Sequence, residues 1–433
     1  MKNRSHFIAL LIFFIHTLPG VSYGQEPKKV PDGTEGLFLT VPPPDSLTKK
    51  LPPNEFDGSY STFRIGFGYI HDFVTYSQSK VFKQQMDSAG LSLDAQGKLR
   101  DFRVLGSGVL KTKRTISWKF AYMYDGDKET WLVRESGITI GVPELKGIIF
   151  VGRTKEGYSM VKVMNGHSPW AAERQMALDV IPILADGIKW LGYLPKSRIF
   201  WNLGYFNDII SEGQGFSTFE WQYVARVGWL PIYDKEKSKV LHVATNLRYA
   251  KPLDGKIALK SRPEANPAPQ IINTGTFDAN HSNHIGAEIY YSTGNLLLGS
   301  EVMVHNFTSN KDASNNADNH SFFGGDVQIA YLFTGSKRPY NTSNGNIFGF
   351  VPVKKSVFKG GWGEWEAMVR LSMLDLNDGE IKGGKFWRLT PMVNWYMSRA
   401  IRIELIYGYG ELDRYNLKGG VQFFQARIQF TVM

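Results

Sequence analysis

The chain has 433 residues, with 44 Gly, 20 Tyr, 11 Trp and no Cys, and its formal net charge is +10. Beyond the N-terminus no run approaches the roughly 20 apolar residues that a transmembrane helix needs, which excludes a polytopic helical membrane protein. The lack of Cys excludes a disulfide framework and thiolate metal ligands. Lys and Arg are scattered singly without a nucleic-acid-binding motif, so nucleic acid is not expected as a partner.

The N-terminus has the pattern of a cleaved signal peptide over residues 1–24. Lys2 and Arg4 form a basic start, an apolar stretch follows, and small residues precede the expected cleavage before Gln25. Loss of these two cations lowers the formal charge from +10 to +8. Residues 25–58 contain seven prolines among polar residues, which predicts an extended N-terminal segment. The mature protein is therefore expected to be exported.

The remaining chain, residues 59–433, reads as a succession of strands of about ten residues that alternate apolar with polar or small side chains. A further strand at 271–279 is an open alternative. The sixteen predicted strands are 60–70, 101–110, 115–125, 130–141, 146–153, 188–194, 198–207, 218–230, 239–251, 283–293, 295–305, 321–334, 363–376, 385–397, 400–409 and 421–432.

The lengths of the connections alternate. Every second connection is a short turn, with 335–362 as the exception. The other connections are predicted to be long loops, at 71–100, 154–187, 208–217, 252–282, 306–320 and 410–420. Short turns on one rim and long loops on the other, over an even number of strands, are typical of outer-membrane β-barrels. A soluble sandwich has no physical reason to sort its loops in this way.

The composition of the two faces of the strands indicates which face meets water and which meets lipid. On strand 363–376, Val369 and Leu371 share one face, while Glu366 and Arg370 lie on the other. A closed soluble core could not hold so many charges, because desolvation costs several kcal/mol per ion. We therefore expect the apolar faces to meet lipid and the charged faces to line an aqueous lumen. The basic residues expected there are Arg64, Lys119, Arg226, Arg248, Arg370, Arg388, Arg402 and Arg427, against the acidic Glu220, Glu288, Glu301, Asp326, Glu366 and Glu404.

Several segments resemble the phosphate-selective porin family. They are GGWGEWEAMVRLSMLDLNDGEIKGGK (360–385), LKSRPEANPAPQIINTGTF (259–277), FTGSKRPY (333–340), GRTKEGYSM (152–160) and FFQARIQFTV (423–432). The resemblance implies a sixteen-stranded antiparallel transmembrane barrel that assembles as a homotrimer in the outer membrane. It also implies that the third long loop, 154–187, folds inward as a constriction.

The same resemblance implies positions that contact the anion. Lys155 and Ser159 match a basic residue and a hydroxyl at the start of the constriction loop, and Arg103 matches a basic position on the second strand. Val104 departs from the paired basic residues expected beside it. The implied function is passive diffusion of small hydrophilic solutes, mainly anions such as phosphate or polyphosphate. Because the predicted lumen carries both signs of charge, only modest anion selectivity is expected.

Other readings predict different chemistry. A barrel with an occluded lumen could act as a surface-binding protein or as an enzyme at its rim, but the sequence nominates no catalytic group there. A soluble exported β-protein is a third reading. His281 and His284 have a spacing that a metal could use, yet no third ligand accompanies them, so a solvated loop is expected. We therefore expect no enzymatic activity, no cofactor and no metal.

Overall fold

The computed structural model describes residues 53–209, 217–311 and 317–432. The predicted signal peptide and most of the predicted segment 25–58 lie outside the described residues. Within the described ranges, no helix is long and apolar enough to span a membrane.

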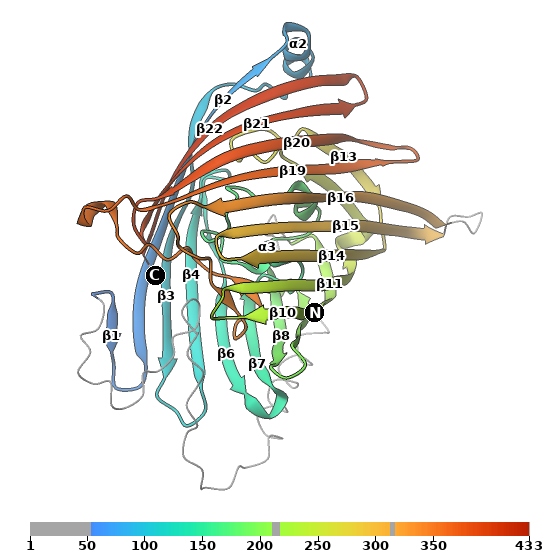
Figure 1. Cartoon of the computed structure of the whole chain (residues 1–433). Coiled ribbons are helices and arrows are strands. Elements are labelled where there is room, and N and C mark those ends of the chain that lie inside the picture. The colour runs from blue at the N-terminus through green and yellow to red at the C-terminus, as the bar shows by residue number, and fades with distance from the viewer. Residues whose placement is uncertain (1–52, 210–216, 312–316, 433) are drawn as a thin grey trace. The chain divides into compact units, whose positions relative to one another are not determined.

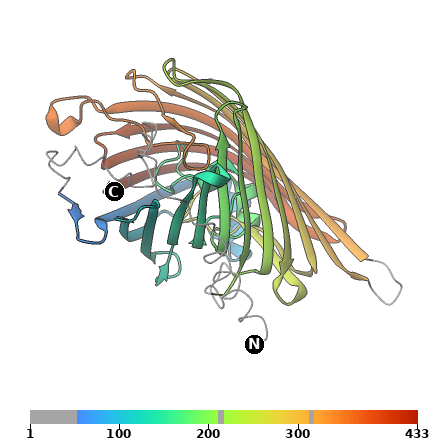
Figure 2. The same cartoon turned by 90° about the horizontal axis from the view of Figure 1, so that it is seen from below.

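Antiparallel strands form one continuous wall that closes on itself (Figures 1 and 2). The last strand pairs with the first long one, from Phe67 opposite Val432 to Gln78 opposite Val421. The strands of the wall are β2 Thr62–Gln78, β3 Gln96–Leu110, β4 Ile116–Asp125, β5 Thr130–Val133, β6 Ser136–Val142, β7 Gly147–Thr154, β8 Ala185–Leu194, β9 Ile199–Asn207, β10 Phe219–Asp234, β11 Lys239–Pro252, β14 His281–Thr293, β15 Leu296–Lys311, β16 Ala317–Leu332, β19 Glu364–Asp378, β20 Ile381–Tyr396, β21 Ile401–Arg414 and β22 Leu417–Val432.

Sixteen strands make up the barrel, because β5 and β6 both pair with β4 and together form one interrupted strand. All sixteen predicted strands are confirmed. A short strand β1, Glu55–Asp57, adds to β2 at one rim. The predicted extra strand at 271–279 exists as β13, Ile272–Asp278, but it pairs with β12, Lys256–Ser261, outside the barrel sheet. The other paired segments are β17 Tyr340–Asn341 and β18 Ile347–Phe348.

The helical elements are short and lie in the connections. They are α2 Lys80–Ser88, α3 Met160–Val163 and the 3-10 turns η2 Pro143–Leu145, η3 Met176–Val180, η4 Leu253–Gly255 and η5 Val357–Lys359. Ser79 caps the start of α2 by accepting a hydrogen bond from the backbone N–H of Phe82 (3.2 Å).

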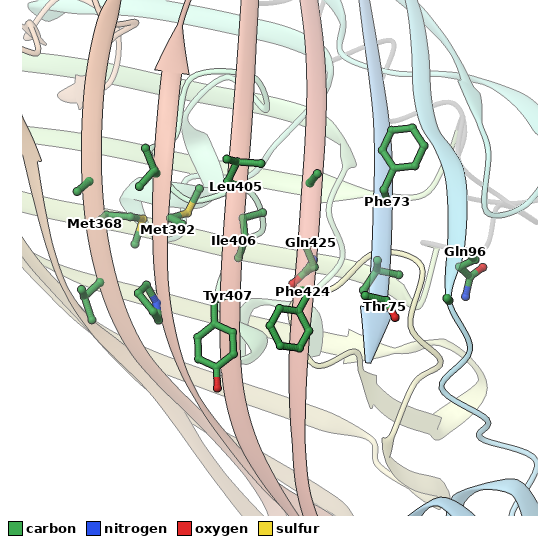
Figure 3. Close-up of a pocket in the computed structure, with 17 residues that line it drawn as sticks. Phe73, Thr75, Gln96, Met368, Met392, Leu405, Ile406, Tyr407, Phe424 and Gln425 are labelled. Atoms are coloured by element: carbon green, nitrogen blue, oxygen red, sulfur yellow. The ribbon is translucent and has the colours of Figure 1, made fainter. Parts of the chain in front are cut away.

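The two faces of the wall have the predicted polarity. On β19, Val369 and Leu371 are 41% and 44% exposed on the outside, whereas Arg370 and Glu366 are buried on the inside. The outer face is therefore the apolar one, as expected for a wall that meets acyl chains. An apolar hollow of about 880 Å³ lies in the wall along β2, β3 and β19–β22, where Figure 3 shows Tyr407 and Phe424. It is lined almost entirely by carbon, so we assign it to the lipid-facing wall and not to the lumen.

Three details of the prediction were wrong. Strict alternation along the predicted strand 218–230 places Phe219 on the outer face with Trp221. Phe219 is instead buried inside, because the ladder shifts register between these two residues and a bulge reverses the alternation. The described parts of the predicted loops 306–320 and 410–420 are largely strand, because pairing continues to Lys311 opposite Ala317 and to Arg414 opposite Leu417. His284 is not in a solvated loop, since it lies buried in β14.

Candidate functional site

The loop between β7 and β8, residues 155–184, is attached to the inner wall at its start. The backbone N–H of Ser159 donates to Asn246 Oδ1 (3.0 Å), and those of Met160 and Val161 donate to carboxylate oxygens of Glu288 (2.5 Å) and Glu301 (3.2 Å). These N–H groups begin the one-turn helix α3, so the wall carboxylates satisfy donors that the helix itself leaves free. The loop therefore turns into the lumen and not away from the barrel.

The tip of loop 155–184 reaches the far wall. The carbonyl of Pro169 accepts from Arg402 (2.7 Å), and that of Trp170 accepts from Arg402 (2.9 Å) and Asn394 (2.8 Å). The Trp170 indole is 1% exposed and donates to Gln328 Oε1 (2.5 Å). The loop thus crosses the lumen from β7 to β20 and β21, and it narrows whatever passage remains.

The segment between β16 and β19, residues 333–363, enters the lumen from the opposite rim. Phe348 is buried and packs edge-on against Trp170, with ring centroids 5.9 Å apart. Arg226 donates to the carbonyls of Gly345 (2.6 Å) and Asn346 (3.2 Å). Connections from the two rims therefore meet inside the barrel, and apolar contacts join them.

A third connection, loop 253–280, fills the side of the lumen near β19 and β20. Its hairpin β12–β13 places Glu264 against Arg370 (2.6 Å), and Arg388 donates to the carbonyls of Pro263 (2.5 Å) and Glu264 (3.0 Å). Ser261 donates to Asp179 of loop 155–184 (2.8 Å). The part of the lumen beside β10–β22 is consequently packed with side chains and paired charges.

The arginines predicted on the later strands point inward and are covered by these segments. Arg226 is ion-paired with Glu288 (2.5 Å), and Arg248 with Glu156 (3.2 Å). The guanidinium groups of Arg226 and Arg388 also donate to loop carbonyls, so these donors are used within the protein. In the structure these residues fasten the loops, and their predicted contact with an anion stays a prediction.

The remaining predicted residues lie near β2–β8. Arg64 pairs with Glu55 at the rim (2.6 Å), and Arg103 pairs with Asp101 (2.5 Å). Ser159 is fully buried against the wall. Lys155 is 3% exposed and donates to the carbonyl of Met164 (2.5 Å).

A group of cations surrounds Glu135 on this side of the lumen. Lys119 and Lys155 approach its carboxylate at 3.8 and 3.6 Å. We call this group the basic cluster; its members, which act on one another electrostatically, are Arg103, Lys119, Arg134, Lys155, Arg174 and Lys189. The acidic groups that act on these cations are Asp101, Glu135, Glu156 and Glu173, so six basic groups face four acidic ones. The cluster therefore carries an excess of positive charge.

In the described ranges three members of the basic cluster have no carboxylate partner. One of them, Lys189, donates to the hydroxyl of Thr154 (2.8 Å) and to the carbonyl of Lys155 (3.0 Å). Within the described ranges, neither Arg134 nor Arg174 has a carboxylate oxygen within 4 Å, although Arg174 donates to the carbonyl of Val161 (3.3 Å). Both are partly exposed, and Lys119 also keeps about a fifth of its side chain exposed. Partly exposed cations without a carboxylate contact inside a barrel are positioned to attract an anion.

Enclosure by the barrel also affects the loop members of the cluster. Burial lowers the pKa of Lys155 well below its usual range, although Glu135 acts in the opposite direction. Burial lowers the pKa of Arg174 to about 10, which leaves it charged at neutral pH. Asp179 is exposed to the lumen but enclosed by its walls, and this removal from bulk water raises its pKa to about 7.

Sequence reasoning missed Arg134, Arg174 and Lys189 as site residues. Arg134 lies at the interruption between β5 and β6, where the sequence was read as one uninterrupted strand. Arg174 lies in the loop that was predicted to fold inward, but the sequence did not distinguish it from the other charges of that loop. A signal was present in the sequence as the pair Arg134–Glu135, two adjacent charges that break the alternation of an otherwise apolar strand.

A closed, sixteen-stranded antiparallel barrel with an apolar exterior, a charged interior and an inward-folded loop defines the outer-membrane porin class. The model of the family described as phosphate-selective porin O and P matches residues 70–432, and the chain belongs to this family. The predicted family is thereby confirmed. Because this is a family of channels, the prediction that the chain is not an enzyme is confirmed as well.

Solved structures share the fold at low sequence identity. The anion-selective porin from Comamonas acidovorans has a TM-score of 0.51 and 11% identity, over 86% of this chain and all of that one. The trimer form of OmpT, an outer membrane protein of Vibrio cholerae, has a TM-score of 0.53 and 11% identity, over the same shares. At these identities the likeness shows the fold alone.

One relative among curated proteins is an uncharacterized protein of Caulobacter vibrioides. It is 34% identical over 125 residues, which are 29% of this chain and 21% of that protein. The chain therefore spans about a fifth of the length of the curated relative that it matches, and this match adds nothing on activity.

Proposed function

We propose that this porin passes small hydrophilic solutes with a preference for anions such as phosphate or polyphosphate. The observation that carries the proposal is the basic cluster, in which Arg134 and Arg174 face the lumen without a carboxylate partner. Fixed positive charge in a narrow, low-dielectric passage lowers the energy of an anion and raises that of a cation. Family membership and the fold shared with an anion-selective porin support the same choice.

The test is the reversal potential of single channels in a planar bilayer under a KCl gradient. We expect anion preference in the wild type and a loss on the order of tenfold in the permeability ratio for the double variant Arg134→Gln and Arg174→Gln at low salt. A unit charge about 8 Å from the ion contributes about 2 kcal/mol at an effective dielectric constant of about 20, and screening with a Debye length of about 10 Å reduces this to about 0.9 kcal/mol. The two charges together then contribute about 2 kcal/mol. Lys196→Gln, an exposed turn lysine, is the matched control and should leave the potential unchanged. Cation preference in the wild type would refute the proposal.

The predicted site residues belong to the same proposal. We propose that Arg103 and Lys119 contribute to the positive field of the passage, and that Lys155 lines its narrow part. Ser159, which the sequence assigned to the anion, is fully buried, so its proposed role is indirect: its backbone N–H and hydroxyl position the start of loop 155–184.

An occluded barrel is the second candidate function, and one observation favours it. Three connections occupy the lumen beside β10–β22, and residues from all three belong to one buried apolar cluster. Under this reading the chain acts through its surface loops, and the purified protein shows no unitary conductance in a bilayer. Discrete conductance steps would reject it.

The processing and assembly expected from the sequence remain proposals. We propose that residues 1–24 are removed on export, that 25–58 form a periplasmic segment, that 59–433 form the barrel with its constriction loop at 154–187, and that three copies assemble. Mass spectrometry of the mature protein should give an N-terminus at Gln25. Cross-linking in native membranes should give a trimer, and a monomer alone would refute that part.

A further inference from the structure

The second half of segment 333–363 leaves the lumen and lies on the rim that carries the short turns (Figure 1). Its middle is buried, with Phe348 at 1% and Val351 at 5% exposed. From Lys354 onward its side chains are mostly exposed. The backbone N–H of Val357 donates to the carbonyl of Met397 (2.9 Å), which ties this part to the turn after β20.

Exposed aromatic side chains lie together at this rim. Trp362 is 84% exposed and Phe358 is 65% exposed. The carbonyl of Trp362 accepts hydrogen bonds from the indoles of Trp365 (3.1 Å) and Trp395 (2.9 Å), whose rings stack 5.0 Å apart on the outer wall. Exposed indoles joined to the outer face of a barrel belong at the boundary between water and acyl chains.

The charged side chains of segment 333–363 are all basic. Between Asp326 and Glu364 the sequence contains no acidic residue. Lys354, Lys355 and Lys359 are all exposed, and Glu364 is 2% exposed with its carboxylate used by Thr334 and by the backbone of Lys354. In the described ranges no carboxylate lies within 4 Å of the ammonium group of any of these three lysines, although that of Lys354 donates to the carbonyl of Gly335 (3.0 Å).

Several cations on the other short turns of the same rim have carboxylate partners. Lys111 pairs with Asp57 (2.7 Å), Arg114 with Glu144 (2.7 Å), and Lys237 lies 3.8 Å from Asp234. Lys146, Lys196 and Arg399 on other turns of this rim are exposed as well. What distinguishes the three lysines of segment 333–363 is that they lie close together in the sequence and beside the exposed rings of Phe358 and Trp362.

We propose that Lys354, Lys355, Phe358, Lys359 and Trp362, called here the rim patch, bind the phosphate headgroups of anionic phospholipids. Short turns of outer-membrane barrels lie on the periplasmic side, so the lipids are those of the periplasmic leaflet. The ammonium groups attract the phosphate, while the two rings insert at the level of the glycerol backbone. The lipid would hold the outer part of segment 333–363 on the membrane, while the middle of the same segment lies in the lumen.

The test measures retained lipid on purified full-length protein. Wild type, the triple variant Lys354→Gln, Lys355→Gln and Lys359→Gln, and the control pair Lys235→Gln and Lys237→Gln are reconstituted in nanodiscs of mixed phosphatidylglycerol and phosphatidylcholine. Native mass spectrometry then counts the lipids that remain bound. Wild type and control should retain phosphatidylglycerol selectively. The triple variant should retain it on the order of 100-fold more weakly, from about fivefold per lysine.

A second measurement is independent of the lysine substitutions. Fluorescence of Trp362 is obtained as the difference between wild type and Trp362→Phe in vesicles that contain brominated lipid. Quenching should be stronger with brominated phosphatidylglycerol than with brominated phosphatidylcholine, and excess inorganic phosphate should not remove it. Equal retention of both lipids, or a triple variant that retains phosphatidylglycerol like wild type, would overturn the proposal. A triple variant that instead changes the oligomeric state in lipid-free detergent would assign the patch to a second copy of this chain and would overturn it too.

Discussion

Replacing Arg338 by Ala should release segment 333–363 from the lumen and enlarge the channel. Arg338 joins three elements: its Nη2 donates to both carboxylate oxygens of Glu366 (2.8 and 3.0 Å) and to Tyr396 (3.2 Å), and its Nη1 donates to the carbonyls of Ser168 (3.1 Å) and Gly349 (3.2 Å). Glu366 belongs to the wall and Ser168 to loop 155–184. This one guanidinium therefore links the segment to the wall and to the constriction loop.

The magnitude follows from what the substitution leaves behind. Removing one partner of a buried ion pair costs about 3 to 5 kcal/mol. Glu366 would keep hydrogen bonds from Asn394 (2.9 Å) and Tyr396 (2.8 Å), so the lower figure applies. About 3 kcal/mol shifts the docking equilibrium of the segment roughly 150-fold toward the undocked state. The barrel ladder is untouched, so folding of the wall should persist.

The assay is single-channel recording in a planar bilayer, with heat-modifiable gel migration as the check that the barrel is folded. Arg338→Ala should show a higher mean conductance and more frequent transitions between conductance levels than wild type. Lys337→Ala changes an exposed neighbour and should behave as wild type. If folded Arg338→Ala shows the conductance and noise of wild type, segment 333–363 does not limit the passage and the reasoning fails.

Two further predictions concern the constriction loop. Since the pKa of Asp179 is raised to about 7, this carboxyl is mostly neutral below pH 7 and becomes negative above it, so anion preference should fall as pH rises from 6 to 8. Asp179→Asn should flatten that dependence in reversal-potential measurements, and an unchanged profile would show that another group is responsible. Trp170→Ala removes a fully buried ring between two lumen segments, a change that costs about 3 to 5 kcal/mol. Loop 155–184 should then exchange its amide hydrogens faster, while the strands of the wall keep their protection; equal protection of the loop would contradict its predicted dependence on this ring.

The outline of the barrel followed from local pattern. The period of two in β19 separated Val369 and Leu371 from Glu366 and Arg370, and the structure places them outside and inside as predicted. The prediction failed where the backbone departs from strict two-residue alternation. A bulge turns Phe219 inward, and the interruption between β5 and β6 was not predicted, so Arg134 was not recognised as a site residue. The bulge has no distinctive residue pattern, because bulges depend on the partner strand as well as on their own residues. The interruption is marked in the sequence only by the adjacent charges of Arg134 and Glu135.

The arginines show a second limit of sequence reasoning. Arg226 was correctly placed inside, but its acceptors are carbonyls of Gly345 and Asn346, about 120 positions further along the chain. Arg427 is paired with Asp72, which lies 355 positions earlier. The residue pattern of one strand determines that an arginine side chain points into the lumen. Whether that side chain is then covered depends on which loops pack against the strand.

The sequence by itself determined that this chain is a sixteen-stranded barrel with lipid outside and charge inside, because strand alternation and turn length are encoded by neighbouring residues. The tertiary structure decided which of those charges remain available. Three connections fold into the lumen and take up most of the arginines of the later strands, while Arg134 and Arg174 keep their charge without a carboxylate partner in the described ranges. The physical reason is that the pairing of a charge depends on contacts between distant segments, which form only when the barrel closes around its own loops.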